Sequence, residues 1–125
     1  MDLNQVTIPA RNVRESIEFY RRMGFILIVE AEHYARFECP QGGSTFSIHQ
    51  VESCHGNSGC VVYFETEHLD QKVRQLQDAG FLFFQQPQDE PWLWREARLN
   101  DPSGNVICLY WAGENRRNPP WRVEP

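Results

Sequence analysis

The chain has 125 residues, with 12 basic and 17 acidic side chains and a formal net charge of −5. This length is typical of one domain with its own core, and the acidic balance argues against a nucleic acid as partner. No apolar run is nearly long enough to span a membrane, and the first residues do not read as a secretory signal. The four cysteines follow no disulfide-rich spacing, which predicts reduced thiols and a cytoplasmic location.

The first half of the chain predicts one helix among four strands. Asn12 is a suitable N-cap for a helix over Val13 to Met23, and Glu15 completes a capping box. Gly24 is expected to end this helix, because glycine enters the left-handed conformation without a Cβ clash. Strands are expected at Asn4 to Ile8, Phe25 to Glu30, Tyr34 to Cys39 and Thr45 to Val51.

The second half begins after a linker at Glu52 to Ser58 and has the same elements. A helix is expected from about His68 to Ala79. The tail, Gly113 to Pro125, contains Pro119-Pro120 and is therefore expected to be irregular and extended. Strands are expected at Cys60 to Glu65, Phe81 to Gln85, Trp94 to Leu99 and Asn105 to Trp111.

The two halves repeat one pattern, in which three apolar residues at helical spacing precede a Gly-Phe pair. Each member recurs 56 residues later (69 − 13, for example): Val13, Ile17, Tyr20 and Gly24-Phe25, then Leu69, Val73, Leu76 and Gly80-Phe81. The repeat predicts an α+β fold in a single domain of residues 1–125. In it, two βαβββ modules, residues 3–51 and 59–112, form a cup-shaped mixed sheet with a site at their junction.

Two motifs of the second half carry a family resemblance. The segment Glu90 to Glu96, followed by Asp101 to Asn105, is similar to the Pro-Trp-Gly-x-Arg-Glu … Asp-Pro-x-Gly-Asn stretch of bleomycin-resistance-like proteins. With the repeat, it resembles the vicinal oxygen chelate superfamily of glyoxalases, bleomycin-resistance proteins and extradiol dioxygenases, over residues 3 to about 112. The resemblance implies a homodimer. Leu93 stands where the family pattern has glycine.

In metal-dependent members of that family, two ligands come from each module. The corresponding positions here are Gln5, Ser47, Cys60 and Cys108. A serine hydroxyl is a poor ligand and two cysteines replace a histidine and a glutamate, so no metal or other cofactor is expected. Cys60, Cys108 and His49 would suit zinc, but buried cysteine is more often a small hydrophobe. His49 is also a candidate general base, although a strand histidine more often bonds a neighbour.

Aromatic residues gather in and after the second half, and they suit a planar or cationic organic ligand through stacking and cation–π attraction. Core packing and dimer contacts would use the same residues. Trp92 and Trp94 would face the same way if their segment is extended, and Arg95 with Glu96 is a candidate ion pair at the mouth of the site. The residues expected to bind the ligand are Gln5, Ser47, His49, Cys60, Phe64, Trp92, Trp94, Arg95, Glu96, Cys108 and Tyr110.

The preferred function is metal-independent binding of a small molecule. By resemblance to bleomycin-resistance proteins, the chain would sequester an aromatic or cationic molecule. The alternative is a divergent glyoxalase-type lyase, isomerase or dioxygenase with a displaced or soft-metal site. A third interpretation is an interaction module without catalysis, which would have no pocket-sized ligand.

Overall fold

The computed structural model describes residues 1–53 and 59–123. The chain divides into two compact units. The first comprises Met1–Gly59 with Asp101–Asn105, and the second comprises Cys60–Asn100 with Val106–Pro125. Within the described residues, no helix is long and apolar enough to cross a membrane.

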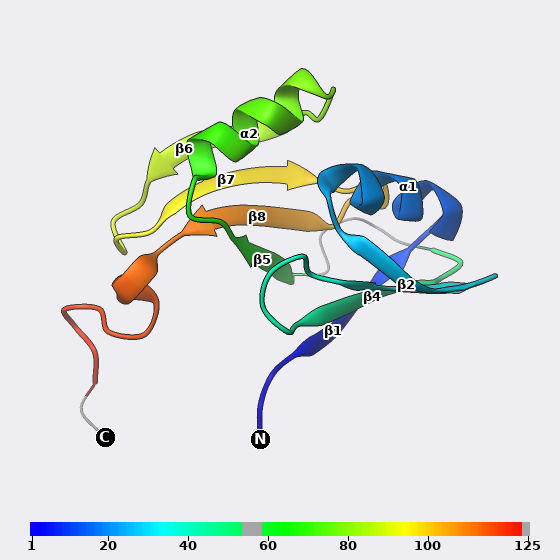
Figure 1. Cartoon of the computed structure of the whole chain (residues 1–125), viewed down its shortest axis with the longest axis horizontal. Helices are drawn as coiled ribbons and strands as arrows, with labels where there is room; N and C mark the ends of the chain where they lie inside the picture. Colours follow the sequence, from blue (N-terminus) through cyan, green and yellow to red (C-terminus); the bar gives the residue numbers. More distant parts are fainter. Residues whose placement is uncertain (54–58, 124–125) are drawn as a thin grey trace. The chain divides into compact units, whose positions relative to one another are not determined.

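The first unit contains a four-stranded sheet in the order β1-β4-β3-β2, with α1 against one face (Figure 1). Strand β1 runs parallel to β4, and the other neighbouring pairs are antiparallel. The elements are β1 (Gln5–Ala10), α1 (Val13–Met23), β2 (Ile26–Ala31), β3 (Tyr34–Glu38) and β4 (Thr45–Gln50).

Helix α1 begins and ends where the sequence predicts. The Asn12 side chain accepts a hydrogen bond from the Glu15 backbone N–H at 3.0 Å, and Gly24 has φ 109° at the C-terminus. The apolar face of α1 buries Tyr20, whose ring lies 5.6 Å from Phe37 and 5.0 Å from Phe46, centroid to centroid. The core of this unit therefore lies between α1 and the sheet.

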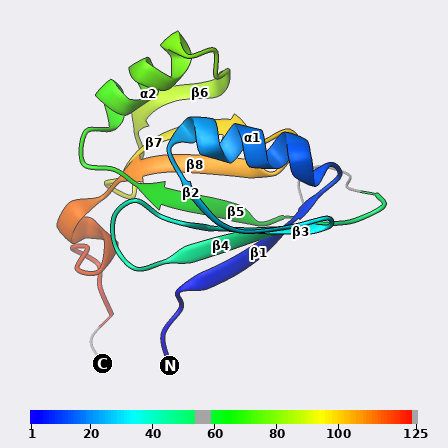
Figure 2. The same ribbon diagram turned by 45° about the vertical axis from the view of Figure 1, so that its right-hand side comes forward.

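The second unit repeats this topology with the order β5-β8-β7-β6 and α2 against one face (Figure 2). Strand β5 is parallel to β8, as β1 is to β4. The two βαβββ modules expected from the repeat are thus confirmed. The elements are β5 (Val61–Glu65), α2 (Leu69–Asp78), β6 (Phe83–Asp89), β7 (Arg95–Asn100), β8 (Val106–Trp111) and the 3₁₀ helix η1 (Gly113–Arg116).

The tail and the segment before β7 differ from their predictions. The tail is not irregular throughout, because η1 follows β8 directly and the two prolines come only after it. The Trp92–Trp94 segment is not extended either. It forms a tight turn between β6 and β7, in which the Glu90 N–H donates to the Trp94 carbonyl at 2.8 Å and Leu93 has φ 69°. Of the predicted linker, residues 54–58 lie outside the described residues.

The Asp-Pro-x-Gly-Asn motif forms the β7–β8 turn, as predicted, and its contacts place it in the first unit. Asp101 is 5% exposed; its Oδ1 accepts from the backbone N–H groups of Ser103 and Asn105, both at 2.9 Å. Its Oδ2 accepts from the Tyr20 hydroxyl at 2.6 Å and from Asn105 Nδ2 at 2.8 Å. Asn105 Nδ2 also donates to the Pro9 carbonyl at 2.8 Å. These hydrogen bonds tie the motif to α1 and β1, so its role is structural.

Each sheet has one face against its helix and one face without a helix. In the first sheet Phe46 packs on α1, so Ser47, the next residue, points to the other face. In the second sheet Arg95 bonds Asp70 of α2, so Glu96 points to the other face. We call these two surfaces the helix-free faces of the first and second units, and most of the predicted site residues lie on them.

Candidate functional site

Three aromatic rings meet on the helix-free face of the second unit. Trp94 stacks on Tyr110 with ring centroids 4.8 Å apart and an interplanar angle of 25°. Tyr63 meets both rings edge-on, at 5.8 Å from Trp94 and 5.4 Å from Tyr110. The Trp94 indole N–H donates to the Asn115 carbonyl at 3.2 Å, which fixes the ring. We call Tyr63, Trp94 and Tyr110 the aromatic cluster; Tyr63 is its most exposed member, at 40%.

A buried carboxylate lies on the same face. Glu96 is 1% exposed; its Oε1 accepts from Arg98 Nη2 at 3.1 Å and its Oε2 from the Trp92 indole N–H at 2.7 Å. Arg98 Nη2 also lies 3.1 Å from the Tyr63 hydroxyl, to which it donates. Both carboxylate oxygens therefore have partners inside the protein, and the ion pair holds Trp92 and Tyr63 in place around the aromatic cluster.

Cys108 is a buried neutral thiol. Burial first, and then the nearby Glu96 carboxylate, raise the pKa of Cys108 to about 12. At neutral pH this thiol is protonated, so it is a weak nucleophile and a weak metal ligand. Cys60 is exposed and precedes β5, and the residue of β5 opposite Cys108 is Tyr63. The two cysteines are therefore not brought side by side.

The helix-free face of the first unit carries a polar network instead of an aromatic one. The Gln5 amide donates to Ser47 Oγ and accepts from the Thr45 hydroxyl. Ser47 Oγ lies 2.9 Å from the Tyr34 hydroxyl, which accepts from Arg36 Nε at 2.8 Å. Ser47 is fully buried, whereas Arg36 is exposed. The network thus runs from the sheet interior to a cation at the surface.

This network predicts an early tyrosine titration. The hydrogen bond with Ser47, and then Arg36, lower the pKa of Tyr34, whereas burial raises the pKa of the other tyrosines. As the pH rises, Tyr34 is expected to ionise first. Phenolate absorbance should show an earliest step that Tyr34→Phe removes, and an unchanged early part of the curve in that variant would contradict the prediction. The other three tyrosines are Tyr20, Tyr63 and Tyr110.

The donors at the four positions that the family resemblance assigns to metal ligands fit a divalent ion poorly. Gln5 Oε1 already accepts the Thr45 hydroxyl, and Ser47 offers only a neutral hydroxyl. Cys108 is protonated, and Cys60 does not lie opposite it. Across residues 1–53 and 59–123, no three His, Cys, Asp or Glu side chains gather as a metal centre would need. Neither the family metal nor the zinc alternative with His49 is supported by these residues.

Ten of the eleven predicted site residues divide among three places, and Cys60 lies apart from them, exposed and just before β5. The second helix-free face brings together Trp92, Trp94, Glu96, Cys108 and Tyr110. The first helix-free face holds Gln5 and Ser47, with His49 two residues further along β4 and exposed. Phe64 and Arg95 lie on the face of the second sheet that α2 covers, one residue from Tyr63 and Glu96 respectively.

The predicted Arg95–Glu96 ion pair is wrong. Neighbouring residues of a strand point to opposite faces, so Arg95 bonds Asp70 of α2 at 2.8 and 3.0 Å and Asp89 at 3.0 Å. Glu96 pairs with Arg98, two residues along the same face. The sequence reasoning missed Arg98, together with Tyr34, Arg36 and Tyr63. The signal that would have found them is the alternation of side chains between the two faces of a strand. It is counted from Glu96, Ser47 and Cys108 and carried across to the paired strands.

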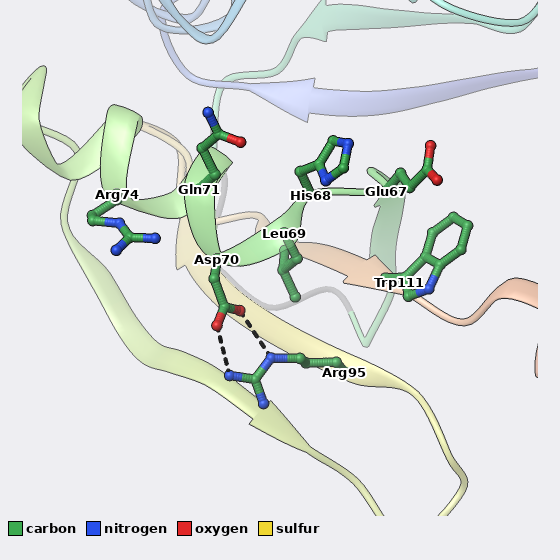
Figure 3. A pocket seen from close by; sticks show the side chains of 8 residues that line it. All are labelled: Glu67, His68, Leu69, Asp70, Gln71, Arg74, Arg95 and Trp111. Carbon is green, nitrogen blue, oxygen red and sulfur yellow. Dashed lines mark hydrogen bonds and ion pairs between the residues drawn. The ribbon is translucent and has the colours of Figure 1, made fainter.

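A second candidate site lies on the other side of the second sheet, beside the start of α2 (Figure 3). Its volume is about 410 Å³, and the ion pair of Arg95 with Asp70 lies within its lining. The hydrogen bond from Arg95 lowers the pKa of Asp70, so both charges are satisfied by each other. Of its lining, only Leu69 is buried. The lining residues are Glu67, His68, Leu69, Asp70, Gln71, Arg74, Arg95 and Trp111.

Solved structures share this fold at low sequence identity. A bleomycin-binding protein complexed with bleomycin is 18% identical, with TM-score 0.74 over 89% of this chain and 98% of that chain. A glyoxalase/bleomycin resistance protein/dioxygenase from Nocardioides is 20% identical, with TM-score 0.77 over 99% and 90% of the two chains. A lactoylglutathione lyase from Agrobacterium tumefaciens is 13% identical, with TM-score 0.74 over 88% and 92%. At these identities the likeness concerns the fold.

The sequence itself identifies the family. No curated protein matches it significantly. Residues 2–109 match the Glyoxalase/Bleomycin resistance protein/Dioxygenase superfamily, in agreement with the repeat and with the topology of both units. The chain belongs to the glyoxalase/bleomycin resistance protein/dioxygenase superfamily.

Proposed function

We propose that the protein binds and sequesters a small organic molecule without a metal, and that the aromatic cluster is the main contact. The observation that carries this proposal is the stacked pair of Trp94 and Tyr110 with Tyr63 at its edge. Aromatic walls with a few fixed polar groups are typical of small-molecule sites. One structural neighbour is a bleomycin-binding protein, which supports the same class of function.

The proposed ligand is planar and aromatic, and a cationic one is preferred. Tyr63 and Trp92 expose 40% and 43% of their surface, so ring faces are available for stacking. The net charge of −5 favours a cation over an anion in the overall field. The Glu96 carboxylate contributes mainly by fixing Trp92 and Arg98, since both of its oxygens are occupied.

Binding without catalysis is favoured by the state of the reactive groups on the second helix-free face. The Cys108 thiol is protonated at neutral pH and Glu96 is fully paired, so neither is free to act as nucleophile or base. One observation favours the alternative, a glyoxalase-type enzyme: the hydrogen bond with Ser47, and then Arg36, lower the pKa of the Tyr34 hydroxyl. Mass spectrometry of the recovered ligand separates the two, because sequestration returns it unchanged.

Calorimetric titration of paired variants tests the proposal. The probes are bleomycin, the planar cation proflavine and the aromatic anion benzoate. Stacking is worth about 0.5–1.5 kcal/mol per ring beyond the buried area, so Trp92→Ala/Trp94→Ala should weaken binding roughly ten- to hundredfold. Trp111→Ala is the matched control, because Trp111 lines the cavity beside α2 and should leave the affinity unchanged.

Two results would overturn the proposal. One is equal affinity of the parent and the Trp92→Ala/Trp94→Ala variant for every probe that binds. The other is loss of affinity in Trp111→Ala alone, which would move the site to the cavity beside α2. Binding of benzoate alone would refute only the preference for a cation.

We also propose that the protein is a homodimer whose contacts include the tail. Trp121 and Val123 are 56% and 86% exposed in the single chain, which leaves apolar surface for a second copy to cover. Sedimentation at micromolar concentration tests this. A monomer, or a dimer that persists after removal of residues 117–125, would contradict it.

A further inference from the structure

The repeat allows the two helix-free faces to be compared position by position. Arg36 of β3 lies opposite Ser47 in the first sheet, and Arg98 of β7 lies opposite Cys108 in the second. Ser47 and Cys108 are 61 residues apart, as are His49 and Tyr110, which lie opposite Tyr34 and Glu96. Arg36 is thus the counterpart of Arg98.

The partners of these two arginines differ. In the second unit, Glu96 neutralises Arg98 at 3.1 Å. In the first unit, the position equivalent to Glu96 holds Tyr34, a neutral phenol. Of the guanidinium nitrogens of Arg36, only Nε donates to this phenol. Among residues 1–53 and 59–123, no carboxylate oxygen lies within ion-pair distance of Arg36, including Glu38, two residues along the same strand. Among the described residues, the guanidinium charge of Arg36 on the first face therefore has no carboxylate to neutralise it, whereas that of Arg98, its counterpart on the second face, has Glu96.

The remaining donors of the network can be counted. The Gln5 amide donates to Ser47 Oγ, the Val6 carbonyl and Thr7 Oγ1, and Arg36 Nε donates to the Tyr34 oxygen. The single bond between Ser47 and Tyr34 uses one of their two hydroxyl protons. Among the described residues, one hydroxyl proton is therefore left without an acceptor in either arrangement, as are both terminal NH₂ groups of Arg36.

Burial decides which hydroxyl offers that proton. Ser47 is fully buried, whereas Tyr34 is partly exposed. If Ser47 donates to Tyr34, the phenol accepts from Ser47 and Arg36 and presents its own O–H outward. A phenol O–H beside two guanidinium NH₂ groups is a set of donors without an acceptor.

We propose that the helix-free face of the first unit binds an oxyanion, a carboxylate or phosphate group of a small molecule, through the terminal guanidinium nitrogens of Arg36 and the Tyr34 hydroxyl. The planar guanidinium fork matches a carboxylate with two parallel hydrogen bonds. Ser47 and Gln5 are positioning residues, because Ser47 hydrogen-bonds the phenol and Gln5 hydrogen-bonds Ser47. This site belongs to a different unit from the aromatic cluster and does not depend on it.

The test uses the full-length protein and two simple anions, propionate and inorganic phosphate, with neutral propionamide as the shape-matched control. Chemical-shift titration of isotopically labelled protein measures each affinity at low ionic strength, where screening is weak. Propionate or phosphate is expected to bind and propionamide not. Which anion binds more tightly distinguishes a carboxylate site from a phosphate site.

Variants separate a local site from the general charge of the protein. Arg36→Gln should weaken anion binding roughly ten- to hundredfold, and Tyr34→Phe less, since it removes one neutral donor. Arg14→Gln on α1 makes the same change of charge at an exposed position and should leave the affinity unchanged. Saturating anion should also raise the pKa of Tyr34, seen as a later first step in the phenolate titration.

Three outcomes would overturn the inference: no anion binds the parent, Arg36→Gln binds as tightly as the parent, or Arg14→Gln loses as much affinity as Arg36→Gln. Loss of the aromatic ligand in Trp92→Ala/Trp94→Ala bears only on the proposed function. The two proposals can therefore fail separately.

Discussion

Replacing Asp101 by alanine is expected to lower the free energy of unfolding by about 3–5 kcal/mol. The buried carboxylate accepts four hydrogen bonds, from two backbone N–H groups, the Asn105 amide and the Tyr20 hydroxyl. Alanine leaves these donors buried without an acceptor, and each such donor costs about 1–3 kcal/mol, although the costs are not additive. Urea denaturation with an unchanged slope measures the loss.

Two further variants show whether the effect comes from the hydrogen bonds around Asp101. Tyr20→Phe removes one of the four donors and should cost about 1 kcal/mol. Asp78→Ala, at the exposed end of α2, should change stability by less than about 0.5 kcal/mol. If Asp101→Ala costs no more than Asp78→Ala, the hydrogen bonds around Asp101 do not stabilise the fold.

Replacing Glu96 by alanine is expected to cost a similar amount, about 3–5 kcal/mol. Glu96 is 1% exposed and its partner Arg98 only 23%, so removal of the carboxylate leaves a largely buried guanidinium unpaired. The Trp92 indole N–H loses its acceptor as well. The double variant Glu96→Leu/Arg98→Met should recover most of the loss, because it removes both charges together.

The exposed ion pair of Arg95 with Asp70 is the matched control for this experiment. Asp70 is 53% exposed, so Asp70→Ala should cost less than about 1 kcal/mol. The double-mutant cycle of Glu96 and Arg98 gives their coupling energy. A coupling no larger than that of Asp70 with Arg95 would show that the second helix-free face is not organised by a buried ion pair.

The sequence predicted the elements well because their signals are local. The apolar spacing of Val13, Ile17 and Tyr20, the Asn12 cap and the Gly24 stop all act within α1, and each was confirmed. The repeat extended the same prediction of elements to the second unit. The least accurate prediction was the tail, where η1 forms before the prolines are reached.

The candidate site was harder to predict, because it depends on which strands pair and in what register. Arg95 and Glu96 are neighbours in sequence but lie on opposite faces, and their true partners, Asp70 and Arg98, follow only from the folded sheet. Trp92 and Trp94 were expected on an extended segment and instead lie in a tight turn. Tyr63 was missed because its place beside Trp94 and Tyr110 is set by the pairing of β5 with β8.

The most direct measurement is the response of the four tryptophan indole N–H resonances to the tightest-binding aromatic probe. Each indole reports on a different place: Trp94 on the aromatic cluster, Trp92 on Glu96, Trp111 on the cavity beside α2, and Trp121 on the tail. The proposed function predicts saturable shifts of Trp94 and Trp92 with Trp111 unmoved. Saturable shifts of Trp111 with Trp94 unmoved would contradict it.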